Sequence, residues 1–282
     1  MPINRNAFSP ILQQFISQFE TKIASLSLAG SWDNVGLLIE PLKIRNTATS
    51  LTDLSVFLTI DLTNTVLTEA IQGDCNLIIT YHPILFTPTQ SVTPLSQHIA
   101  ATALSHGIAV FSPHTALDSM SGGINDFFLS QTLGSREFSD LRRPCLLERD
   151  TPVGRIAQLR DAVSLRDLVA EIKALTGRSM LRVALPLGRE SEGLEVDVKS
   201  VAFCAGSGGS VIKGGGADCV VTGELSHHEI LAHTSAGRAV ILTEHSNCER
   251  PFLGKLKDLL EDRLGLRKVV ISQLDDDPVR FF

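Results

Sequence analysis

Histidines and carboxylates gather in four short segments of this 282-residue sequence, and each segment follows an apolar run. In chain order the segments are Tyr81-His82-Pro83, His114 to Asp118, Glu224 with His227 and His228, and His245 with Glu249. Short runs rich in valine and isoleucine predict buried strands. Ligands of open α/β sheets bind outside the carboxyl ends of the strands, so we expect the four segments to converge. Imidazole and carboxylate together suit zinc, manganese, iron or magnesium, which predicts a divalent metal site.

Spacing gives the last of these segments the clearest geometry. His245 and Glu249 are four residues apart. If a helix begins near Ser246, the histidine lies just before it and the glutamate in its first turn, so both reach one ion. A carboxylate can also bridge two ions. His114 and Asp118 have the same spacing, but a proline-containing loop makes their common direction less secure.

Each candidate also has a purely structural explanation. His82 precedes a proline and fits a turn histidine, and Asp118 fits the N-cap of a helix starting near residue 123 or 124. Glu249 in a first helical turn would complement the helix dipole. His227 and His228 fit solvated first-turn residues better than metal ligands. The placement of all of them after four separate strands favours the metal site.

Composition indicates a protein of a reducing compartment. The five cysteines are widely spaced without a C-x-x-C pair, which argues against a disulfide framework and a thiolate zinc site. The net charge is −6 without a basic stripe, so direct nucleic-acid binding is disfavoured. No stretch reaches the roughly 18 apolar residues of a membrane span. We expect a soluble cytoplasmic protein, with nuclear and mitochondrial locations as alternatives.

Apolar runs alternate with stretches of helical period, which predicts an α/β fold. Apolar residues from Phe8 to Phe19 recur at helical spacing, and a second helix is expected at Leu165–Leu175, between the N-cap Ser164 and Gly177. The expected strands are Val56–Ile60, Leu77–Thr80, Ile108–Phe111, Val201–Ala205, Cys219–Thr222, Val240–Leu242 and Val269–Ile271.

The alternation breaks in the charged, proline-containing stretch from about residue 134 to 153. We therefore predict two linked α/β lobes, residues 1–140 and 153–282, joined by a linker at 141–152. Each lobe has a common domain size.

Two further segments leave alternatives open. Cys204–Ser210 is a glycine-rich strand-to-helix turn that fits either an anion site or a tight packing turn. Ser31–Leu37 contains the single tryptophan, and its Asp33 fits either a contact to a metal ligand or, preferably, a turn.

Six blocks in the same order resemble the NIF-three-like family, also labelled GTP cyclohydrolase I type 2 homologues. The blocks are SWDNVGLLIE, LIITYHPILF, FSPHTALD, FCAGSGGS, VTGELSHHE and EHSNCER. The resemblance runs from about residue 8 to the C-terminus. The sequences of the last two blocks are similar to those of the animal branch of the family.

This resemblance implies two linked α/β lobes, a hexameric ring and one or two divalent ions per subunit. By motif match, His82, Asp118, His245 and Glu249 fall on metal-ligand positions, with Glu249 as the bridging carboxylate. Bacterial members have His-His where this chain has Tyr81-His82, so a ligand of the second ion is replaced by a phenol. The linker at 141–152 stands where some members carry an inserted domain.

The leading functional hypothesis is a metal-dependent hydrolase acting on a nucleotide or a phosphorylated small molecule. His114, His227 or His228 would then serve as acid or base. The family label suggests GTP ring opening, although the sequence shows no recognisable guanine pocket. The alternatives are an interaction protein with a partner in transcriptional regulation, whose metal site is structural or vestigial, and a metal-handling protein.

Overall fold

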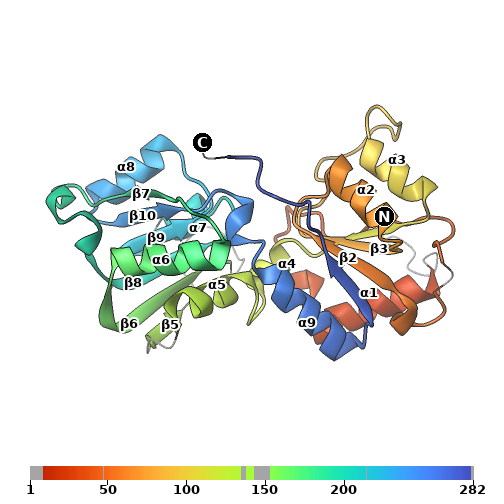
Figure 1. The fold of residues 1–282 in the computed structure, drawn as a ribbon, viewed down its shortest axis with the longest axis horizontal. Coiled ribbons are helices and arrows are strands. Elements are labelled where there is room, and N and C mark those ends of the chain that lie inside the picture. The colour runs from red at the N-terminus through yellow and green to blue at the C-terminus, as the bar shows by residue number, and fades with distance from the viewer. Residues whose placement is uncertain (1–8, 47, 135–137, 143–152, 214, 281–282) are drawn as a thin grey trace. The chain divides into compact units, whose positions relative to one another are not determined.

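The structure, a computed structural model, describes residues 9–46, 48–134, 138–142, 153–213 and 215–280. It divides into two compact units that each combine a sheet with helices (Figure 1). The first unit comprises the described parts of Met1–Met120 and Leu253–Asp275, and the second those of Ser121–Phe252 and Asp276–Phe282. The predicted α/β class is confirmed.

The described part of the first unit contains a five-stranded sheet in the order β1-β4-β3-β2-β11. Strands β2, β3, β4 and β11 are parallel neighbours, and β1 pairs antiparallel with β4. The strands are β1 Gly36–Ile39, β2 Ser55–Thr59, β3 Leu77–Thr80, β4 Ala109–Ser112 and β11 Lys268–Ile271. The carboxyl ends of β2, β3 and β4 therefore lie at one edge of the sheet.

Helices cover both faces of this sheet (Figure 1). On one face Phe57, Ile78 and Val110 pack in a buried cluster with residues of α2 and α3. Phe111 points to the opposite face, where its ring contacts Phe15 of α1 at 5.4 Å. The helices are α1 Pro10–Lys22, α2 Asn64–Gln72, α3 His98–Ser105, α4 Thr115–Ser119 and α9 Phe252–Leu264, with 3-10 turns η2 Leu26–Leu28 and η3 Leu51–Asp53.

The described part of the second unit contains a six-stranded sheet in the order β5-β6-β8-β9-β10-β7. Strands β8, β9 and β10 are parallel neighbours. The antiparallel pairs are β5 with β6, β6 with β8, and β7 with β10. The strands are β5 Phe138–Arg142, β6 Arg155–Ser164, β7 Arg182–Ala184, β8 Asp197–Cys204, β9 Cys219–Thr222 and β10 Ala239–Leu242.

Phe128 of α5 stacks on Phe203 of β8 with ring centroids 3.9 Å apart, which fixes α5 on one face of the second sheet. Ile212 of α7 packs with Ile156, Ala202 and Val220 on the other face. The helices of this unit are α5 Ile124–Leu133, α6 Leu165–Thr176, α7 Gly209–Ile212 and α8 His227–Ser235, with 3-10 turns η4 Glu190–Glu195 and η5 Ser246–Cys248.

All seven predicted strands are present, although β8 begins at Asp197 rather than Val201. The first predicted helix is α1, which begins at Pro10 and extends to Lys22. The second is α6. Its N-cap Ser164 accepts the Asp167 N–H, and Gly177 ends it in the left-handed conformation.

The division of the chain differs from the predicted one. Because β11 pairs with β2, the segment Leu253–Asp275 returns to the first unit. Because β5 pairs with β6, residues 138–142 belong to the second unit rather than to a first lobe ending at residue 140. Most of the predicted linker, residues 143–152, lies outside the described residues.

Four of the five cysteines lie in the described residues, and all four are free and buried. They are Cys75, Cys204, Cys219 and Cys248, and Cys145 lies outside the described residues. No helix in the described part of the chain has the length and apolarity to cross a membrane.

Candidate functional site

Polar side chains gather in the first unit at the carboxyl ends of its parallel strands. Asp61 follows β2, Tyr81 and His82 follow β3, and His114 and Asp118 follow β4. The rings of Tyr81, His82 and His114 contact one another with centroids 4.9 to 5.6 Å apart. Asp33, in the turn before β1, is the sixth polar residue of this group.

Asp33 binds and orients His114. Nδ1 of His114 lies 2.7 Å from Oδ1 of Asp33, and the Thr115 hydroxyl and N–H donate to Oδ2 at 2.5 and 3.3 Å. Burial opposes ionisation of Asp33, but hydrogen bonds from His114 and Thr115 outweigh it and hold its pKa below the ordinary value. An ionised carboxylate only accepts, so Nδ1 carries the proton and Nε2 of a neutral His114 carries the lone pair.

The backbone of His114 adopts φ 34° and ψ −123°, a conformation that non-glycine residues rarely take. This histidine directly precedes α4, in which Thr115 and Asp118 lie. Strain of this kind persists only where surrounding contacts enforce it, and it often marks functional sites. Asp33 accepts from the His114 ring and from the N–H of the next residue, Thr115, so its contacts bracket this position.

His82 has the same kind of carboxylate partner. Its Nδ1 lies 2.9 Å from Oδ1 of Asp61, so as a donor to that carboxylate it keeps the lone pair on Nε2. Metal-binding histidines commonly have such a partner on the second nitrogen. His82 therefore has the carboxylate partner expected of a metal ligand in addition to its place before Pro83.

Tyr81 donates a hydrogen bond to Asp118, one of the predicted metal ligands. Its hydroxyl donates to Oδ2 of buried Asp118 at 2.6 Å. A phenol that donates its proton to a carboxylate is not a phenolate ligand. The capping explanation of Asp118 fails, because Gly123 is the N-cap of α5 and receives no side-chain cap.

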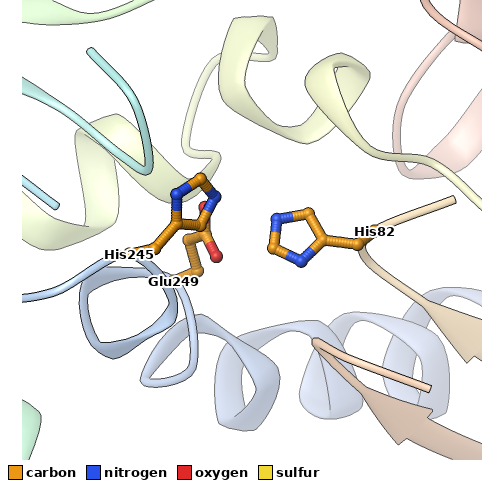
Figure 2. A group of neighbouring side chains, drawn as sticks. All are labelled: His82, His245 and Glu249. Carbon is orange, nitrogen blue, oxygen red and sulfur yellow. The ribbon is translucent and has the colours of Figure 1, made fainter. Parts of the chain in front are cut away.

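In the second unit, Glu224 follows β9, while His245 and Glu249 flank the 3-10 turn η5 after β10. His245 and Glu249 lie side by side in Figure 2, where His82 of the first unit is also drawn. Their spacing of four is carried by η5, because α9 begins only at Phe252. A helical turn does begin at Ser246 with His245 as its N-cap, as predicted, but it is the 3-10 turn η5 and ends at Cys248, so Glu249 lies at its C-cap and before α9.

Glu224 orients His245 as Asp33 orients His114. Nδ1 of His245 lies 3.1 Å from Oε1 of Glu224, which also accepts the Ser207 hydroxyl. The hydrogen bond from Ser207 lowers the pKa of Glu224 most, and the contact with His245 lowers it further. Burial acts in the opposite direction, but the pKa stays below its ordinary value. Glu224 is therefore ionised and accepts from Nδ1, so the lone pair of the neutral form of His245 is on Nε2.

That lone pair faces a second acceptor. Nε2 of His245 lies 3.6 Å from Oε1 of Glu249, whose side chain is almost fully buried. Two ligands of one tetrahedral zinc ion stand about 3.4 Å apart when each bond is about 2.1 Å. The chemistry and separation of this pair therefore fit two ligands of one divalent ion.

Gly206 keeps space over this pair. With φ +63°, it approaches so closely that a Cβ would lie 2.7 Å from Oε1 of Glu249 and 3.1 Å from Nε2 of His245. Gly208 is equally confined, because a Cβ there would lie 2.6 Å from Oγ1 of Thr222. These close approaches support the packing explanation of the glycine-rich turn, and α7 after it spans only Gly209–Ile212.

His227 and His228 are exposed in the first turn of α8, with their rings 5.4 Å apart. Ser226 caps this helix in a capping box with Glu229. The exposed position of His227 and His228 agrees with the explanation that they are solvated first-turn residues. An acid or base role for these two histidines stays a prediction.

Three carboxylates that orient the histidines received no definite role from the sequence: Asp33, Asp61 and Glu224. Asp61 and Glu224 follow strands, which is the signal that pointed to the histidines. Asp33 reaches His114 across 81 residues, and its sequence neighbourhood indicates a turn. His82, His245 and Glu249 each offer one ligand atom of a type that could hold a metal ion.

The chain matches, over residues 12–278, the model of the family described as Duf34/NIF3 (NGG1p interacting factor 3). It is 38% identical over 268 residues to Protein NIF3 homolog of Schizosaccharomyces pombe, covering 89% of this chain and 91% of that protein. It is 37% identical over 259 residues to NIF3-like protein 1 of Drosophila melanogaster, covering 91% and 84%. The fold is similar to that of Staphylococcus aureus hypothetical protein SA1388, with a TM-score of 0.78 at 22% identity, covering 97% and 100%.

Proposed function

Because the chain belongs to the Duf34/NIF3 family, we propose that His82, Asp118, His245 and Glu249 bind a divalent metal ion and that the loaded protein is a hydrolase. Its substrate class would be a nucleotide or a phosphorylated small molecule. The ligand set is the one that the family resemblance implies. Zinc, manganese, iron and magnesium are all candidates for the ion.

One observation supports this proposal most strongly. His82, His114 and His245 each place Nδ1 within hydrogen-bonding distance of a carboxylate, at 2.7 to 3.1 Å. Three such pairs give each neutral imidazole a fixed orientation and leave Nε2 as the basic atom. This arrangement suits metal ligation by His82 and His245 and proton transfer by His114.

When bound, the ion supplies a Lewis acid beside the substrate. Nε2 of His114 accepts a proton from the attacking group or returns one to the leaving group, while Asp33 keeps its other nitrogen protonated. The Tyr81 hydroxyl orients Asp118, and Glu224 orients His245. General acid–base catalysis of this kind contributes about 100- to 10,000-fold to a rate.

The test begins with protein stripped by a chelator and reloaded separately with each of the four metals. Metal content is measured by elemental analysis, and hydrolysis is followed on a panel of nucleotides and phosphoesters. The variants His245→Ala and Glu249→Gln should lose metal and turnover. His106→Gln, in an exposed histidine of the first unit, is the matched control and should keep both. Metal binding without turnover on any substrate would refute the hydrolase.

An interaction protein is the second candidate, favoured by the family description NGG1p interacting factor 3. The partner would be a protein of transcriptional regulation, and the metal would be structural. Glu249→Gln separates the two functions. Partner binding that survives loss of the metal would show that the interaction does not need the site.

We also propose that the protein assembles as a ring-shaped homohexamer, as the family resemblance implies. Light scattering after size-exclusion chromatography should give a mass near six times that of the chain. The same measurement on the stripped protein tests whether the ion holds the ring together.

A further inference from the structure

Two large aromatic side chains lie exposed beside His114. Trp32 is 52% exposed and Phe86 is 51% exposed. Their rings contact each other with centroids 6.1 Å apart. Each also contacts the His114 imidazole, with centroids 6.3 Å apart and rings almost perpendicular at 88°. The two rings therefore stand at the residue to which proton transfer is assigned.

The aromatic pair is held in place by its backbone surroundings. Trp32 lies between Gly30 and Asp33, whose carboxylate is clamped by His114 and Thr115. A Cβ on Gly30 would lie 2.5 Å from Nε1 of Trp32, so glycine is what lets the indole pack against the chain. The Asn34 side chain donates to the Leu85 carbonyl and thereby ties the segment of Trp32 to that of Phe86.

A fixed, half-exposed aromatic pair is suited to stacking. Aromatic side chains bury large areas at little conformational cost, and they pack against planar rings in offset-stacked or edge-to-face arrangements. Nucleobases stack on such side chains in a largely sequence-tolerant way, because every base has a π-face. A phosphoester without an aromatic ring has no π-face to stack on these two residues.

We infer that Trp32 and Phe86 form the binding surface for a planar heteroaromatic ring of the substrate, of nucleobase type. This inference rests on the proposed function, because it selects the nucleotide over the non-aromatic phosphoester as the substrate class. It makes Trp32 and Phe86 specificity-determining residues, with His114 at the reacting end of the same surface.

The chain supplies its own probe, because Trp32 is its only tryptophan. Tryptophan emission is followed while the metal-free protein is titrated with guanosine, adenosine and cytidine 5′-monophosphates, and with ribose 5-phosphate as the control that lacks a nucleobase. Calorimetry gives the dissociation constants independently. Working without metal separates ring binding from hydrolysis, so a failure of the hydrolase leaves this test intact.

We expect saturable quenching by at least one nucleotide and none by ribose 5-phosphate. Phe86→Leu should weaken nucleotide binding by about 5- to 150-fold, the range of one lost stacking contact, while Phe86→Tyr should restore it. Trp32→Leu should have a similar effect in calorimetry. Leu42→Ser, in another exposed apolar residue of the first unit, should leave binding unchanged. Melting curves identify any variant that fails to fold.

Three results would overturn the inference. The first is equal binding of ribose 5-phosphate and the nucleotides, and the second is an unchanged dissociation constant in folded Phe86→Leu. The third is an emission spectrum that responds to dilution of the protein but to no nucleotide, because a second copy of the chain would then cover Trp32.

Discussion

Oδ1 of Asp33 lies 2.7 Å from Nδ1 of His114, across 81 residues of sequence. The pair joins a turn before β1 to the end of β4, where the backbone of His114 has a strained φ of 34°. This contact fixes the tautomer of the residue to which we assign proton transfer.

Asp33→Asn should therefore impair turnover more than metal binding. The amide can donate to Nδ1 and select the other tautomer of His114, so the rate should fall about 100-fold or more. Metal content should stay at the wild-type level. Asp53→Asn removes another carboxylate of the first unit, from η3, and should leave the rate unchanged. A wild-type rate in Asp33→Asn would remove the pair from the mechanism.

The same substitution predicts a pH dependence of stability. The pKa of Asp33 is lowered in the folded protein, so its ionised form stabilises the fold above the ordinary value of 3.8. That contribution is lost as the pH falls below 3.8, towards the lower folded pKa. Denaturant unfolding should show Asp33→Asn less stable by roughly 1–3 kcal/mol at pH 7, with the difference shrinking in acid. A difference that grows in acid would contradict this assignment.

Glu224→Gln should weaken the metal site without removing a ligand. Loss of the carboxylate that orients a metal-binding histidine typically costs about 10- to 100-fold in metal affinity. Competition with a chelator of known affinity measures the change. Glu195→Gln, at an exposed carboxylate paired with Arg166, is the matched control. Equal affinities in the two variants would show that Glu224 does not support the site.

Gly206→Ala should disturb the donor pair directly. The new Cβ would crowd Oε1 of Glu249 and Nε2 of His245, in addition to the cost of φ +63°. Gly177→Ala has a similar φ of +66° but meets nothing within 4 Å, so it isolates the backbone cost of about 1–2 kcal/mol. Only Gly206→Ala should lose metal as well as stability. Metal loss in both variants would assign the effect to general destabilisation.

Tyr81→His should raise the number of bound ions. The family resemblance places a histidine of the second ion at this position, whereas Tyr81 donates its hydroxyl proton to Asp118. We expect about one ion per wild-type chain and about two in the variant. Tyr81→Phe, which removes the hydroxyl and adds no ligand, should not exceed one. Elemental analysis of the three proteins decides the matter.

The sequence predicted the elements whose local pattern is strong. Buried parallel strands such as Leu77–Thr80 and Cys219–Thr222 are continuous apolar runs, and Ser164 with Gly177 marks both ends of α6. Strand β6 was missed because Gln158, Arg160 and Asp161 interrupt its apolar pattern. Strand β7 was missed because it spans only three residues at the sheet edge.

What the local pattern does not contain is pairing over long distances along the chain. The pairing of β11 with β2 decides which unit the segment after Phe252 joins, and no residue near it signals that partner. The candidate site shows the same limit. Histidines after strands were identifiable, whereas the pairs Asp33 with His114 and Glu224 with His245 depend on how separate loops fold together.

The central claim is that His82, Asp118, His245 and Glu249 hold a divalent ion, and the metal-to-protein ratio tests it most directly. The ratio is determined by elemental analysis after stripping, reloading and removal of excess metal, for the wild type and for His82→Ala, Asp118→Asn, His245→Ala and Glu249→Gln. We predict at least one ion per wild-type chain and a marked loss in every folded variant, with His106→Gln as the unchanged control. A wild-type protein that retains no metal, or a ratio that survives all four substitutions, would contradict the claim.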